Sequence, residues 1–88
     1  MSPTIKRVGR YRIFIYSEEN RASFEKPHVH VSVGTKGAPG YQEAEVWLGP
    51  PVSEKANEGF RHSEMNEIIK MIAEYQIELQ GSWDEHFA

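Results

Sequence analysis

Pro27-His28-Val29-His30-Val31 is the stretch that decides the fold. Its two histidines alternate with valines at a period of two, which is the spacing of side chains along a β-strand. In a strand, His28 and His30 project from one face, and Val29 and Val31 project from the other. This alternation predicts a strand that packs one apolar face on a core and carries a second, polar face.

Two further segments are predicted to form strands on either side of the strand at 28–33. The segment 10–16 is rich in aromatic and β-branched residues, and both of its faces are largely apolar. The segment 41–48 alternates between an apolar face and a face with aromatic and acidic side chains. Glycines and prolines at 34–40 and 49–51 bound the last strand. The short connections favour a three-stranded antiparallel meander.

Beyond residue 60, the apolar residues recur at intervals of three and four, which is typical of an amphipathic helix. The spacing predicts one long helix over about 61–80, preceded by a short helical turn at 53–57. Gly81 is expected to end this helix or to mark a break in it. The apolar stripe comprises Met65, Ile68, Ile69, Ile72, Tyr75, Leu79 and Trp83. The expected fold class is α+β, a two-layer sandwich in which this C-terminal helix covers one face of the three-stranded sheet.

The composition of the 88 residues fits one cytoplasmic domain over 1–88. Cysteine is absent, which excludes disulfides and thiolate chemistry. No apolar run approaches the ~20 residues of a membrane span, and no signal-peptide pattern is present. The net charge of -3 argues against broad nucleic-acid binding. We therefore expect no membrane association, and no nucleic-acid binding by this chain alone.

The sheet face opposite the helix is expected to be the functional or interface surface. It gathers imidazole, carboxylate and aromatic side chains from two neighbouring strands: His28, His30, Glu43, Glu45, Tyr41 and Trp47. Phe14 and Tyr16 join them if these two residues of the first strand also point to this face. Such a face is too charged for a core and more aromatic than an ordinary solvated surface. The small core and the aromatic tail at Trp83 and Phe87 also favour a symmetric homodimer.

The two histidines have several interpretations. His28 and His30, with Glu43 or Glu45 on the neighbouring strand, are ligand types for zinc or manganese. The same set with a bound metal is able to support hydrolysis, for example in a ribonuclease toxin. Alternatively, the histidines form hydrogen bonds across the sheet or lie at a dimer contact, and the protein has no cofactor. The sequence leaves these alternatives open and identifies no catalytic residue.

Five short motifs follow one another along the chain: Tyr11–Phe14, Pro27–Val31, Trp47–Leu48, Gly59–Phe60 and Trp83–Phe87. Together they resemble a family of small bacterial proteins that is classed only as a domain of unknown function. This chain departs from the family pattern at two positions. Lys26 precedes Pro27 where members commonly have a second proline, and Gly49 stands where many have an acidic residue.

The resemblance implies a protein that acts in a pair. Members of the family often lie beside a second small uncharacterised protein, in pairs that look like toxin–antitoxin modules. The implied function is a non-enzymatic, protein-binding component of such a two-gene module, and the implied partner is the product of the adjacent gene. The resemblance supplies neither a reaction nor the identity of the toxin-like member.

Overall fold

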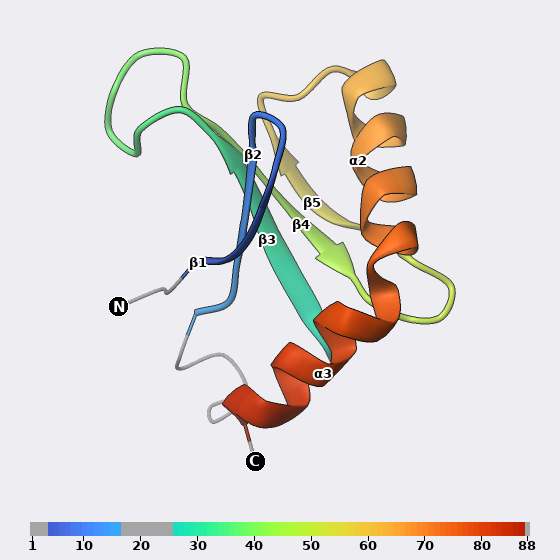
Figure 1. The fold of residues 1–88 in the computed structure, drawn as a ribbon. Helices are drawn as coiled ribbons and strands as arrows, with labels where there is room; N and C mark the ends of the chain where they lie inside the picture. The colour runs from blue at the N-terminus through green and yellow to red at the C-terminus, as the bar shows by residue number, and fades with distance from the viewer. Residues whose placement is uncertain (1–3, 17–25, 88) are drawn as a thin grey trace.

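The computed structural model describes residues 4–16 and 26–87, which form one antiparallel sheet and two helices (Figure 1). The elements are β1 (Thr4–Val8), β2 (Tyr11–Phe14), β3 (His28–Val33), β4 (Gln42–Trp47), β5 (Ser53–Glu58), α2 (His62–Glu74) and α3 (Gln76–His86). The order of strands in the sheet is their order along the chain. Each strand therefore pairs with its neighbours in sequence, and β1 and β5 form the two edges.

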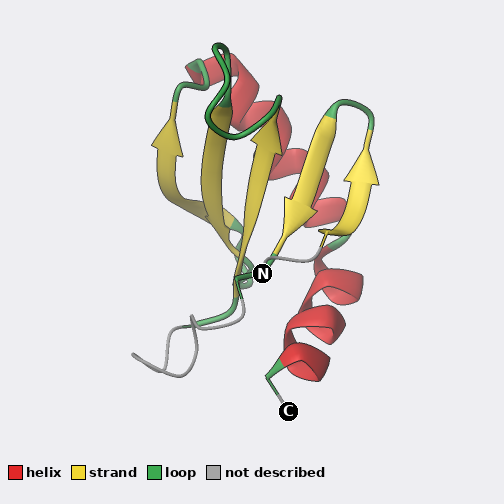
Figure 2. Ribbon diagram, turned by 90° about the vertical axis from the view of Figure 1, so that its left-hand side faces the viewer, coloured by secondary structure: helices red, strands yellow, loops and turns green. Residues whose placement is uncertain are grey.

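The sheet forms one layer, α2 lies against one of its faces, and α3 continues past the end of the sheet (Figure 2). Val29 and Val31 of β3 are fully buried, as are Ala44 and Val46 of β4, because alternate strand residues face the side of the sheet that α2 covers. The helices contribute the other half of the core through Met65, Ile68, Met71, Ile72, Leu79 and Trp83. The opposite face of the sheet is the one that carries the histidines of β3.

The prediction of a three-stranded sheet is wrong, although the fold class remains α+β. The sequence pattern does not predict β1, because apolar and polar residues do not alternate clearly in this segment. It pairs with β2 through a hairpin that turns at Gly9 and Arg10. Gly9 has a φ of 56°, and tight hairpin turns require such positive φ values. The short basic segment is therefore held as a strand by its pairing with β2.

The prediction of a helical turn at 53–57 is also wrong, since this segment lies within β5. Glutamate, lysine and alanine favour helices over strands when they are considered alone. Here the backbone of β5 pairs with β4 from Ser53 to Glu58. Pairing with β4 thus overrides the local preference for a helix, because intrinsic strand propensities differ between residue types by only about 1 kcal/mol.

The single helix predicted over 61–80 is divided into two. α2 ends at Glu74, α3 begins at Gln76, and Tyr75 between them has φ -104° and ψ 15°. Gly81 lies inside α3 and does not end it. After the break, α3 runs in a new direction, past the end of β3 (Figure 1). The change of direction lets Trp83 pack against β3. No helix within 4–16 or 26–87 is long and apolar enough to cross a membrane.

The first turn of α2 is stabilised by Glu64. The backbone N–H of Arg61 donates to Oε1 of Glu64 over 2.8 Å, and Nη2 of Arg10 donates to its Oε2, also over 2.8 Å. The hydrogen bond from Arg61 is the main cause of a pKa for Glu64 below its ordinary value of 4.5, and the bond from Arg10 adds to it. Because the folded state has the lower pKa, the contribution of Glu64 to stability is present above pH 4.5 and is lost as the pH falls through the folded-state pKa.

We expect Glu64→Gln to make the free energy of unfolding depend less on pH in the acid range. Between about pH 6 and pH 3, the free energy of unfolding of the wild type should fall more steeply than that of the variant, because glutamine cannot take up a proton. Urea denaturation at a series of pH values measures both slopes. Glu85→Gln, an exposed position in α3, is the control and should keep the wild-type slope. Parallel profiles for the wild type and Glu64→Gln would contradict the prediction.

Candidate metal centre

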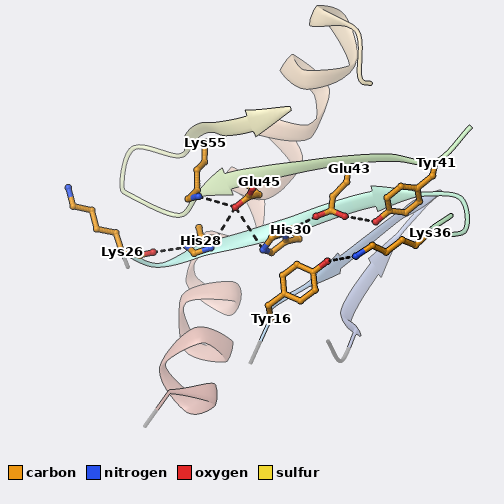
Figure 3. A network of polar contacts seen from close by, with 9 residues as sticks. All are labelled: Tyr16, Lys26, His28, His30, Lys36, Tyr41, Glu43, Glu45 and Lys55. Atoms are coloured by element: carbon orange, nitrogen blue, oxygen red, sulfur yellow. Dashed lines mark hydrogen bonds and ion pairs between the residues drawn. The ribbon is translucent and has the colours of Figure 1, made fainter. Parts of the chain in front are cut away.

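β3 and β4 bring two imidazoles and two carboxylates to one face of the sheet. In the register of this pair, His30 lies opposite Glu45, His28 opposite Trp47, and Ser32 opposite Glu43. Residues that lie opposite each other in an antiparallel pair share a face. Figure 3 shows that the histidine and glutamate side chains project from the same side of the two strands. The period-two pattern of the sequence predicts which side chains of each strand share a face, and the pairing of β3 with β4 sets the register that brings them together.

The two histidines are buried beneath aromatic rings. His28 is 0% exposed and His30 is 3% exposed. The ring centroid of His28 lies 5.1 Å from that of Trp83 in α3 and 5.5 Å from that of Trp47. His30 stacks on Phe14 at 5.1 Å and meets the edge of Tyr16 at 4.4 Å. The expected polar surface is therefore a covered site, with apolar rings that limit access of water to the imidazoles.

Each imidazole uses Nδ1 for a hydrogen bond to an oxygen atom. Nδ1 of His28 donates to the backbone carbonyl of Lys26 over 2.9 Å. Nδ1 of His30 donates to Oε2 of Glu43, also over 2.9 Å. Carbonyl and carboxylate oxygens accept protons in hydrogen bonds and do not donate them, so Nδ1 carries the proton in both rings. In a neutral imidazole, the lone pair then lies on Nε2.

Both Nε2 atoms face one carboxylate oxygen. Nε2 of His28 and Nε2 of His30 each lie 4.0 Å from Oε1 of Glu45. One ligand atom from each of the three residues lies within 4.8 Å of the others. Two ligands at tetrahedral positions on zinc lie about 3.4 Å apart. Small side-chain rotations are therefore enough to bring all three atoms into coordination distance of one ion.

Glu43 supports the site and is not one of the three converging ligands. Its second oxygen, Oε1, accepts a hydrogen bond of 2.5 Å from the hydroxyl of Tyr41. Burial, followed by the hydrogen bond to Glu43, raises the pKa of Tyr41 to about 12, because both favour the protonated hydroxyl that donates this bond. A carboxylate that orients an imidazole in this way is a common outer contact of metal-binding histidines.

Lys55 is a residue of this site that sequence reasoning missed. Its Nζ donates to Oε1 of Glu45 over 3.0 Å and lies 5.2 Å from the ring centroid of Trp47. The contact depends on β5, which the sequence pattern did not identify as a strand. The other two histidines, His62 and His86, lie at the start of α2 and the end of α3. Within the described ranges, only the His28, His30 and Glu45 group has converging ligand atoms.

Comparison with known proteins gives one family match. Neither the curated proteins nor the solved structures include a match to this chain. A family model described as "Domain of unknown function (DUF4160)" matches residues 11–84, a range that includes every residue of the candidate metal centre. The homodimer and the adjacent-gene partner of a toxin–antitoxin-like pair stay predictions. Since the match covers most of the chain and runs from β2 into α3, the protein belongs to the DUF4160 family.

Proposed function

We propose that this protein binds one divalent transition-metal ion, with zinc as the best fit, through His28, His30 and Glu45. The observation that carries the proposal is the orientation of the two imidazoles. Each ring is fixed by a hydrogen bond from Nδ1, and each Nε2 faces Oε1 of Glu45 at 4.0 Å. Ordinary histidines in a sheet need satisfied hydrogen bonds, but they do not need to converge on a shared carboxylate.

The ligand types support zinc over the harder ions. Neutral imidazole is a good ligand for zinc and a poor one for magnesium or calcium, which prefer oxygen. Two histidines and one glutamate are also a known set of protein ligands for catalytic zinc, where water takes the fourth position. The group is open to solvent on the side of Glu45, because the side chain of Glu45 is 25% exposed while both imidazole rings are buried. A fourth, non-protein ligand would enter from that side.

The chemistry that such a site supports is Lewis-acid activation of water. Zinc lowers the pKa of a bound water to about 7, which produces a nucleophile at neutral pH. The aromatic rings around His28 and His30 make the surroundings apolar, which would strengthen the electrostatic effect of a bound ion. We therefore propose hydrolysis as the class of activity to examine once metal binding is established.

Metal binding is tested by calorimetric titration of the chelator-treated protein with zinc. The wild type is expected to bind one ion per chain. Glu45→Gln should lower the affinity by at least about tenfold, because a neutral amide oxygen is a weaker zinc ligand than a carboxylate. Glu58→Gln is the matched control, since Glu58 pairs with Glu43 across β4 and β5 but belongs to no ligand group.

Two results would count against the metal centre. One is a wild-type titration in which the heat equals that of dilution. The other is an equal loss of affinity in Glu45→Gln and Glu58→Gln, which would point to general negative charge and not to coordination at Glu45. Retained affinity in the control together with weaker binding in Glu45→Gln supports the proposed site.

A further inference from the structure

We infer that Lys55 competes with the metal ion for Glu45. The ammonium group occupies Oε1 of Glu45 when no metal is bound, and a bound metal displaces it. The inference rests on the proposed metal-binding function and concerns the regulation of that site. The central observation is that one atom, Oε1 of Glu45, serves both groups. It accepts a hydrogen bond from Nζ of Lys55 over 3.0 Å and faces both imidazole Nε2 atoms at 4.0 Å.

An irregularity in β5 brings Lys55 to the site. Glu45 pairs with Ala56, and the next residue of β4, Val46, pairs with Glu54. Lys55 is thus an extra residue between two paired positions, which defines a β-bulge. In a regular strand, the neighbour of Ala56 projects to the opposite face of the sheet. The bulge re-aims the side chain, and Figure 3 shows Lys55 reaching Glu45 from β5.

The ammonium group of Lys55 is held more firmly than that of an ordinary surface lysine. Its side chain is 21% exposed, against 25% for Glu45, and Nζ lies 5.2 Å from the ring centroid of Trp47. The aromatic ring adds a cation–π attraction to the ion pair. In such partly buried surroundings, solvent screens charges less than it does at an open surface. The ion pair therefore orients Glu45 toward the histidines and neutralises its charge.

A metal ion cannot coordinate Oε1 of Glu45 while the ammonium group of Lys55 keeps its hydrogen bond to the same oxygen. Both are cations, and a metal bound to Oε1 would lie close enough to Nζ for strong repulsion. Metal binding therefore requires Lys55 to leave Oε1, and the energy of the lost ion pair lowers the affinity for the metal. By placing Lys55 next to Glu45, the bulge raises the metal concentration that is needed to displace the Lys55–Glu45 ion pair.

The test is a zinc titration of Lys55→Met, which keeps an unbranched apolar side chain and removes the charge. We expect zinc affinity to increase by about tenfold, within the usual range of coupling between two binding events. Lys55→Gln serves as a second neutral variant, and circular dichroism verifies that both are folded. Lys70→Met is the matched control, because it makes the same charge change at an exposed position of α2, which covers the face of the sheet that does not carry the histidines.

The outcomes separate this inference from the proposed metal site. If the wild type binds zinc and the neutral Lys55 variants bind it no more tightly, the competitor role is overturned and the metal centre stands. If Lys70→Met gains as much as Lys55→Met, the effect is one of net charge, and the competitor role is again overturned. If neither the wild type nor the Lys55 variants bind zinc, both the metal site and the inference fail. A gain confined to the Lys55 variants supports the inference.

Discussion

Zinc binding is expected to disappear in the double variant His28→Ala/His30→Ala. The two histidines supply two of the three converging ligand atoms, and Glu45 alone leaves a single carboxylate that is already paired with Lys55. A single carboxylate supplies only one of the three or four protein ligands that zinc sites require. Calorimetric titration should therefore change from one ion per chain to the heat of dilution.

The other histidines of the chain provide the control for this experiment. The sequence contains four histidines, and His62 and His86 lie outside the converging group. The variant His62→Ala/His86→Ala removes as many imidazoles and should bind zinc as the wild type does. Because His28 and His30 are buried, far-UV circular dichroism must show that their double variant is folded. Undiminished zinc binding by a folded His28→Ala/His30→Ala protein would rule out the proposed centre.

Trp83→Ala is expected to destabilise the protein by about 3–5 kcal/mol, the usual cost of removing a buried tryptophan side chain. Trp83 is buried, and its ring centroid lies 5.1 Å from that of His28 and 4.3 Å from that of Phe87. It therefore joins α3 to the beginning of β3. Small domains are stable by only about 5–15 kcal/mol, so this one substitution should remove a large part of the total.

Urea denaturation of Trp83→Ala and Ile77→Ala provides the comparison. Ile77 is another large apolar residue of α3, but it is 86% exposed. Its replacement should change the free energy of unfolding by no more than about 0.5 kcal/mol, as is usual for surface positions. Similar midpoints for the two variants would mean that α3 does not pack on β3 through Trp83.

Local patterns in the sequence are enough to predict the centre of the sheet and the ligand types of the site. The alternation at 28–31 assigns the histidines to one face and the valines to the other, and the structure has this arrangement. The helical stripe likewise identifies Ile68, Ile72 and Leu79 as residues that the core buries. Both predictions succeed because burial of a repeating apolar face depends only on the spacing of neighbouring residues.

The edges of the sheet and the details of the site were decided by tertiary structure. β5 is a strand because β4 supplies hydrogen-bond partners, and the bulge that directs Lys55 to Glu45 exists only in that pairing. The different roles of Glu43 and Glu45 likewise depend on which imidazole atom each carboxylate faces. The break at Tyr75 turns α3 so that Trp83 covers His28. The sequence alone determined which residues share a face, because side-chain periodicity is local. Register, burial of the histidines and the position of Lys55 arise from contacts between residues far apart in the chain, which no local pattern records.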